Sequence, residues 1–159
     1  MKKPIKSKRI SKQAVIKLNG NIENIFPLFG AFEERKWAEG WNPELIYPET
    51  EKIEEGTTFK TNPTFDGESD YLWIVTKYST ETKLVRYLVI TDDRFWTITV
   101  QCFQIDENNT KAQITYSFTG LNKNGNIQNK KALNNIFSEN LKDWENEINQ
   151  YLKCNNVKT

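Results

Sequence analysis

Two arginines stand where apolar or aromatic residues surround them, and these are the first candidates for chemistry. Arg86 interrupts the apolar run 84–90, where a buried guanidinium could orient a carboxylate or an enolate oxygen. Arg35 lies close in sequence to Trp37 and Trp41, where it could orient a ligand or make a structural cation–π contact. Placement of Arg86 on an outer strand face is an equally simple interpretation.

Several reaction classes lack the side chains they need. The sequence has no histidine, which excludes histidine triads, histidine general bases and most zinc sites, and its two cysteines cannot build a cysteine-only zinc site. Its seven glycines form neither a phosphate loop nor a dinucleotide-binding motif. We therefore expect no cofactor and no metal, and ligand binding is favoured over catalysis.

The acidic clusters indicate surface charge. Residues 66–70 carry carboxylates at alternate positions, but the glycine and distal glutamate of a calcium loop are missing, so a solvated turn is expected. Glu33–Glu34 and Asp92–Asp93 are adjacent pairs, and neighbouring side chains on a helix diverge. No residue is therefore identified as catalytic.

Length and charge indicate one domain with a basic N-terminal arm. The 159 residues can form one core, and beyond the first six basic residues the chain has 16 basic and 21 acidic residues. We expect a flexible arm at 1–11, a domain at 12–153 and a tail at 154–159. The acidic body argues against specific nucleic-acid binding, although the arm could contact an anionic membrane weakly.

The location of the protein is also constrained by composition. No stretch of about 20 apolar residues is present, and no apolar run follows the N-terminal lysines. Two cysteines do not provide the disulfide framework of a small secreted domain. A cytoplasmic protein without a transmembrane segment is expected, and the oligomeric state is left open.

Hydrophobic periodicity predicts an antiparallel sheet followed by a long helix. A first strand is expected at 12–19, with Asn21 capping the first of two short helical segments that continue to residue 38. Short connections between the later strands allow hairpins but not parallel crossovers. The remaining strands are expected at 44–48, 57–61, 70–78, 82–91, 94–105 and 110–120, and an amphipathic helix at 126–153.

The alternation also indicates which side chains face inward. Trp96, Ile98, Val100 and Cys102 share one strand face, and Ala112, Ile114, Tyr116 and Phe118 share another. The runs 72–76 and 84–90 are apolar in both phases, so their inner faces are left open.

Three segments resemble a known superfamily. They are Phe32–Pro43 followed by Tyr47–Pro48, Trp73–Tyr78, and Thr115–Leu121. Together with the order of elements, they resemble the SRPBCC superfamily of START-like and polyketide cyclase-like proteins, in an uncharacterised bacterial subgroup. The resemblance implies an α+β helix-grip fold, with a curved antiparallel sheet of about seven strands around a long C-terminal helix and two short helices after the first strand. It also implies an apolar ligand cavity.

These observations predict binding of a hydrophobic small molecule, lipid or polyketide-like, between sheet and helix. A polyketide cyclase or dehydratase-type enzyme using the same cavity is the alternative, and a protein-interaction module with an exposed apolar patch on the outer sheet is a second. A solid aromatic core is the simpler interpretation of any single residue. The candidate ligand-binding residues are Phe29, Trp37, Trp41, Tyr47, Phe59, Arg86, Tyr116, Phe137 and Leu141.

Overall fold

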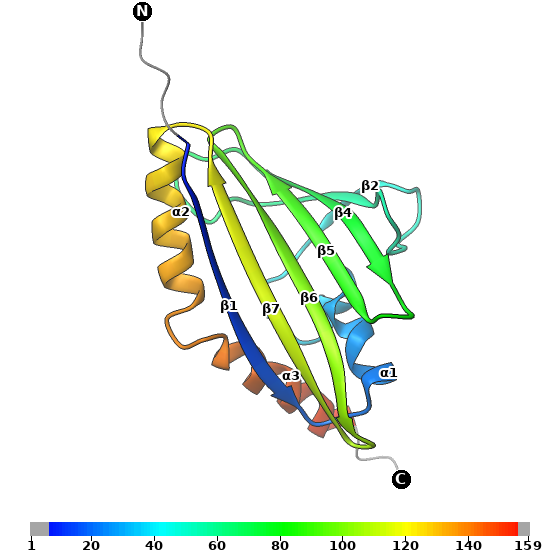
Figure 1. The fold of residues 1–159 in the computed structure, drawn as a ribbon. Helices are drawn as coiled ribbons and strands as arrows, with labels where there is room; N and C mark the ends of the chain where they lie inside the picture. The colour runs from blue at the N-terminus through cyan, green and yellow to red at the C-terminus, as the bar shows by residue number, and fades with distance from the viewer. Residues whose placement is uncertain (1–6, 156–159) are drawn as a thin grey trace, which may run out of the picture.

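A computed structural model describes residues 7–155 as one curved antiparallel sheet with helices on its inner side (Figure 1). The seven strands follow the order β1-β7-β6-β5-β4-β3-β2. They are β1 (Arg9–Leu18), β2 (Glu44–Tyr47), β3 (Thr58–Thr61), β4 (Tyr71–Ser79), β5 (Leu84–Ile90), β6 (Arg94–Asp106) and β7 (Asn109–Gly120). The helices are α1 (Ile22–Ile25), the 3-10 helices η1 (Phe26–Phe29) and η2 (Glu33–Lys36), α2 (Lys123–Ile136) and α3 (Lys142–Asn155). The expected helix-grip fold is confirmed.

The first strand begins earlier than the sequence indicated. Strand β1 pairs with β7 from Arg9 onward, so residues 9–11 belong to the sheet although they were expected in the arm. Backbone pairing does not require apolar side chains, and the polar side chains of this segment add bonds of their own. Arg9 Nε donates to Thr119 Oγ1 at 2.8 Å, for example. Residues 1–6 of the predicted arm lie outside the described residues.

The register resolves the strand phase that the sequence left open. The inner face carries Tyr71, Trp73 and Val75 from β4 and Val85, Tyr87 and Val89 from β5. The outer face is also apolar over part of these strands, where five half-buried side chains neighbour one another. This outer apolar patch consists of Leu72, Ile74, Leu88, Ile90 and Phe95.

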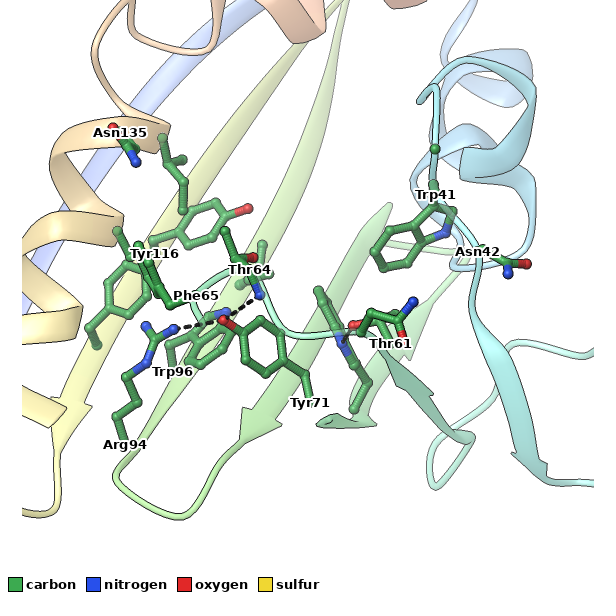
Figure 2. A pocket seen from close by; sticks show the side chains of 17 residues that line it. Trp41, Asn42, Thr61, Thr64, Phe65, Tyr71, Arg94, Trp96, Tyr116 and Asn135 are labelled. Carbon is green, nitrogen blue, oxygen red and sulfur yellow. Dashed lines mark hydrogen bonds between the residues drawn. The ribbon is translucent and has the colours of Figure 1, made fainter. Parts of the chain in front are cut away.

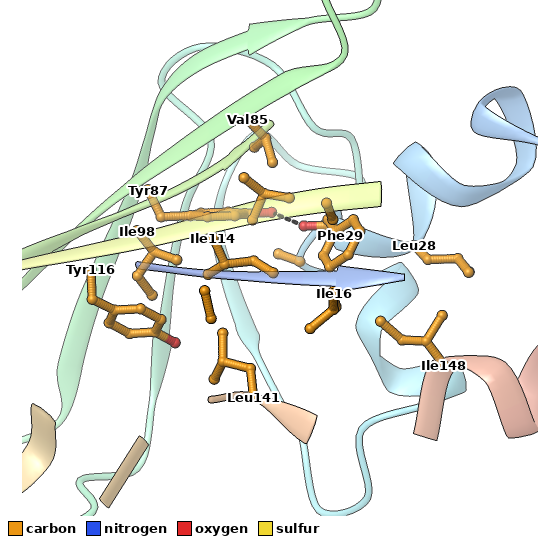
Figure 3. Close-up of a cluster of buried hydrophobic side chains, with 14 of the residues drawn as sticks. Ile16, Leu28, Phe29, Val85, Tyr87, Ile98, Ile114, Tyr116, Leu141 and Ile148 are labelled. Carbon is orange, nitrogen blue, oxygen red and sulfur yellow. Dashed lines mark hydrogen bonds between the residues drawn. The ribbon is translucent and has the colours of Figure 1, made fainter. Parts of the chain in front are cut away.

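The segment after β1 closes one end of the sheet through caps and buried hydrogen bonds. Asn21 caps α1 as expected, accepting from the Glu23 N–H at 2.9 Å. The Tyr87 hydroxyl donates to the Phe29 carbonyl at 2.7 Å, which ties η1 to the inner face of β5 (Figure 3). Trp37 Nε1 also donates to a buried carbonyl of this segment, at 2.7 Å. These bonds satisfy polar groups that would otherwise be unpaired in the core.

The periodicity predicted one continuous C-terminal helix at 126–153, and this prediction is wrong. The helix is interrupted between α2 and α3, where Asn140 and Leu141 adopt left-handed φ values of 52° and 61°. A straight helix of that length would extend about 42 Å, and it could not stay in contact with a curved sheet. The break lets α2 contact β7, β1 and β6 and lets α3 contact β1 near its other end (Figure 1). Leu141 is fully buried at the bend.

The start of α2 is fixed closely against the β5–β6 turn. Asn122 and Asn124 both donate to the Asp93 carboxylate at 2.7 Å. Gly125 permits this approach, because a Cβ there would lie 1.8 Å from the Asp93 carbonyl oxygen. The turn therefore sets the position of the helix that covers the inner face of the sheet.

The main core lies between the sheet, η1 and α3, and it includes Ile16, Phe29, Ile114 and Ile148 (Figure 3). Aliphatic side chains from both ends of the chain meet there, so the first and last elements stabilise each other. Of the helices described, none combines the length and apolar character needed to cross a bilayer.

We predict that Ile148→Ala lowers the free energy of unfolding by about 2–5 kcal/mol, because Ile148 is fully buried where α3 meets the core. Denaturant melts would measure the change, and Asn146→Ala on the exposed face of α3 is the control. A loss below about 1 kcal/mol would show that α3 does not contribute to the core.

Candidate functional site

A cavity of about 320 Å³ lies between the inner face of the sheet and α2 (Figure 2). We call it the larger chamber. Its wall is largely aromatic, with polar groups at one end and along the rim. The lining residues are Gly40, Trp41, Asn42, Thr61, Asn62, Thr64, Phe65, Tyr71, Trp73, Arg94, Trp96, Ile98, Tyr116, Phe118, Ala132, Asn135 and Ile136.

A second cavity of about 200 Å³ adjoins it, and we call this the smaller chamber. The two chambers share Trp41, Trp73, Ile98 and Tyr116, so they lie on either side of a common wall. Segments 34–38 and 143–147 complete the enclosure. The other lining residues are Glu34, Trp37, Ala38, Tyr87, Val100, Asp143, Trp144 and Glu147.

The polar end of the larger chamber is built around Arg94, which is only 1% exposed. Its Nε and Nη2 donate to the Glu68 carboxylate at 3.0 and 3.1 Å, and Nη2 also donates to the Tyr71 hydroxyl at 2.9 Å. The guanidinium lies 4.4 Å from the centre of the Trp96 ring. The charge is therefore paired within the protein, and this end of the chamber is close to neutral.

Two neighbours complete this network. Asn129 Oδ1 accepts from Arg94 Nη1 at 3.3 Å, while its buried Nδ2 has no hydrogen-bond partner among the described residues. The Tyr71 hydroxyl donates to Glu68 Oε1 at 2.6 Å and accepts from the Thr64 N–H at 3.0 Å. Burial and the bond to Glu68 raise the pKa of Tyr71. It therefore stays protonated at neutral pH and acts as a donor.

Sequence reasoning missed this network, although one signal was present. Arg94 is two residues before Trp96 and so shares its inward phase, which the alternation of 96–102 had already indicated. The interpretation of 66–70 as a solvated turn is wrong for Glu68, whose side chain is only 5% exposed. Its partner comes from a distant strand, so no local pattern revealed the pairing.

The adjacent acids Glu33 and Glu34 have different environments. Glu33 is on the surface, where it pairs with Lys36. Glu34 lines the smaller chamber, and its side chain has no hydrogen-bond or ion-pair partner in the described part of the chain. Burial raises the pKa of its carboxyl group well above the ordinary value, although the residue is partly accessible as a whole. The prediction of surface charge for both residues is therefore wrong for Glu34.

Tyr116 separates the two chambers and offers them a free hydroxyl. It is 6% exposed and lines both chambers, and no residue within 7–155 hydrogen-bonds to its hydroxyl. Burial raises the pKa of this hydroxyl, and the negative charges of Glu34 and Asp143 raise it further. The hydroxyl therefore stays protonated and lies within the electrostatic reach of both carboxylates.

The structure brings together some of the predicted site residues. Trp41 and Tyr116 line both chambers, and Trp37 lines the smaller one. Phe59 stacks on Trp73 behind the wall, with ring centres 5.3 Å apart. Phe29, Phe137 and Leu141 belong to the buried core beside the chambers.

Three other predicted positions lie away from the chambers. Tyr47 is 59% exposed at the sheet edge. Arg86 is on the outer face of β5, where its Nε donates to Thr99 Oγ1 at 3.0 Å, because the inner phase of this strand belongs to Val85, Tyr87 and Val89. Arg35 pairs with Glu51 at the surface.

Solved structures with the same arrangement of elements include two enzymes and a bacterial protein. A point mutant of norcoclaurine synthase from Thalictrum flavum, bound to a transition-state analogue, has 11% identity and a TM-score of 0.67, covering 95% of this chain and 99% of that chain. Zhui aromatase/cyclase from Streptomyces sp. R1128 has 7% identity and a TM-score of 0.67, with coverage of 95% and 98%. A solution structure from Thermobifida fusca has 10% identity and a TM-score of 0.66, with coverage of 90% and 93%.

These matches establish the fold. No protein-family model matches the chain, and no curated protein matches it significantly. Because the identities are low, the likeness extends to the helix-grip architecture and not to particular site residues. The matches therefore confirm the helix-grip fold that the resemblance implied.

We predict that Glu68→Gln destabilises the protein by about 3–5 kcal/mol, because it leaves the buried Arg94 guanidinium without its counter-charge. Denaturant melts would measure this, with Asp66→Asn on the exposed part of the same loop as the control. Replacing both partners, as in Glu68→Leu with Arg94→Met, should recover much of the loss. Equal stability of Glu68→Gln and the wild type would contradict a buried pair.

A second prediction concerns Glu34. Its pKa is raised on folding, so the folded state binds more protons than the unfolded chain and stability falls as pH rises through the raised value. Glu34→Gln should therefore be more stable than the wild type at neutral pH. The difference should vanish below the ordinary carboxyl pKa of about 4.3. Melts across this range, with Glu33→Gln as the surface control, would measure it, and a pH-independent difference would refute it.

Proposed function

We propose that this protein binds a hydrophobic small molecule, with an aromatic or otherwise apolar body, in the two adjoining chambers. The observation that carries the proposal is the shared aromatic wall, in which Trp41, Trp73 and Tyr116 face both spaces. Ligand sites in proteins are typically clefts of about 300–1,000 Å³ with apolar walls and a few polar groups. Arg94 and Tyr116 provide such polar groups here.

The neighbouring structures support a cavity that takes small molecules. Norcoclaurine synthase has been solved in complex with dopamine and hydroxybenzaldehyde, at 12% identity to this chain and a TM-score of 0.63. Another neighbour is an aromatase/cyclase. A shared fold favours the same kind of cavity, while the ligand has to be inferred from this chain's own residues.

An enzyme of the polyketide cyclase or dehydratase type is the second candidate. It is favoured by Glu34, whose carboxyl group has a raised pKa and no partner in the described residues, and which lines the same chamber as the free hydroxyl of Tyr116. A carboxyl group and a hydroxyl group that line one cavity can transfer protons to and from a bound substrate. Binding in the chambers is required for this function as well.

The outer apolar patch favours the third candidate, a protein-interaction module. The patch is on the opposite face of the sheet from the chambers, so the two functions can be separated by mutation. Leu88→Ser would disrupt the patch without touching a chamber wall, whereas changes to Ala132 affect only the larger chamber.

We predict that the neutral fluorophore N-phenyl-1-naphthylamine binds with a Kd of about 1–10 μM, which corresponds to a binding free energy of about −7 to −8 kcal/mol. Its binding should quench tryptophan emission. Ala132→Phe should weaken binding by about tenfold or more, because the added ring would occupy the larger chamber. Lys131→Phe, on the exposed side of the same helix, is the matched control. Fluorescence titration would measure both, after thermal melts confirm folding.

Absence of fluorophore binding to the folded wild type would overturn the binding proposal. If Ala132→Phe and Lys131→Phe weakened fluorophore binding equally, the fluorophore would bind elsewhere, and the proposal that the chambers are the binding site would fail.

A further inference from the structure

The smaller chamber is acidic, in contrast to the neutral polar end of the larger one. Glu34 lines it, Asp143 and Glu147 line its solvent-exposed edge, and no lysine or arginine of the described chain lines it. The electrostatics agree with this composition. Burial and then the charges of Asp143 and Glu39 raise the pKa of Glu147, and no basic group lowers it. These acids therefore have no counter-charge in the empty chamber, and a bound cation would favour their ionised forms.

Two polar groups in this chamber have nothing to bind. Tyr116 is 6% exposed as a residue and lines both chambers (Figure 2 shows it in the larger one), and its hydroxyl has no hydrogen-bond partner within residues 7–155. The Glu34 carboxyl group is likewise unpartnered in the described chain. It acts on the hydroxyls of both Tyr87 and Tyr116, which places it toward the inner face of the sheet. Polar groups inside a folded protein usually have partners, and a polar ligand in the chamber would supply one to both the Tyr116 hydroxyl and the Glu34 carboxyl group.

The walls around these groups are aromatic. Trp37 and Trp144 lie with ring centres 5.6 Å apart, and Trp41 and Trp73 lie 5.3 Å apart in an edge-on arrangement. All four rings line the smaller chamber. The negative faces of aromatic rings attract cations, and tryptophan attracts them most strongly. Aromatic rings with carboxylates beside them are the combination that recognises an organic ammonium group.

A metal ion does not fit these observations. Across residues 7–155, no group of three or more acidic, cysteine or histidine side chains is close enough to hold a metal. The carboxylates of the smaller chamber are therefore spread around the space instead of converging on one point. A volume of about 200 Å³ is suited to a small organic head group.

We propose that the smaller chamber binds the protonated amine of an amphipathic ligand whose uncharged apolar body occupies the larger chamber. The ammonium group donates hydrogen bonds to Glu34 and to the oxygen of Tyr116, with the indole rings around it. Arg94 is paired with Glu68, so the larger chamber offers no free positive charge to attract an anionic body. This inference rests on the proposed function and specifies the class of ligand.

Three probes of matched shape test the charge preference: 4-phenylbutylamine, 4-phenylbutan-1-ol and 4-phenylbutyrate, each used to displace N-phenyl-1-naphthylamine at neutral pH. The wild type should bind the amine about tenfold more tightly than the alcohol, since hydrogen bonds to charged groups are the stronger ones. The carboxylate should bind most weakly, because the chamber carboxylates repel it.

Variants locate the preference in the smaller chamber. Glu34→Gln should weaken amine binding about tenfold and alcohol binding much less, because only the amine loses a bond between opposite charges, and Tyr116→Phe should weaken amine binding about threefold. Glu33→Gln is the matched control, because Glu33 is the adjacent acid on the same 3-10 helix but pairs with Lys36 at the surface. Thermal melts of every variant would confirm that it is folded.

The outcomes separate the two proposals. Equal binding of all three probes, or loss of the amine preference in Glu33→Gln but not in Glu34→Gln, would overturn the amine proposal and leave the binding cavity intact. Failure of the fluorophore itself to bind the folded wild type would overturn the binding proposal and the amine proposal with it.

Discussion

A single buried charge fixes the architecture of the larger chamber. The Arg94 guanidinium cannot be buried without partners, and its partners come from three separate parts of the chain: Glu68 in a loop, Tyr71 on β4 and Asn129 on α2. Satisfying them holds the loop before β4 against the sheet, where Thr64 and Tyr71 form part of the chamber rim. The aromatic wall is therefore positioned by an electrostatic requirement as well as by packing.

The cavity exists because the helices do not cover the whole inner face of the sheet. The chain bends between α2 and α3, with Leu141 buried at the bend, and each helix contacts a different part of the sheet. Aromatic side chains span the uncovered middle but do not fill it, since Trp41, Trp73 and Tyr116 border open space. Rings of fixed shape cannot collapse into such a gap as flexible aliphatic chains can. The chambers are thus a consequence of how the helices are placed.

Sequence patterns predicted the strands well and the polar site poorly. Alternation and short turns define β4 to β7, because both are local properties of the chain. The sequence pattern did not predict the bend at Asn140, because the apolar spacing continues through it and the left-handed backbone depends on the curvature of the sheet. Arg86 was predicted as a candidate ligand-binding residue because its neighbours are apolar, but it points outward. The strand phase instead identifies Arg94 as the inward arginine. The environment of the Glu34 carboxyl group is formed by segments more than 100 residues away, including Asp143 and Trp144, so no local pattern could reveal it.

The contact between Gly125 and the β5–β6 turn influences the volume of the larger chamber, although neither Gly125 nor the turn residue Asp93 lines it. Any side chain at position 125 would have to displace Asp93 or move the start of α2, because the space for a Cβ is already occupied. Helix α2 carries Ala132, Asn135 and Ile136 of the larger chamber, so such a shift would change the cavity volume without altering any residue that lines the cavity. The size of this cavity can thus be changed by a substitution at a glycine outside it, so chains of this fold could differ in cavity volume while keeping an identical set of lining residues.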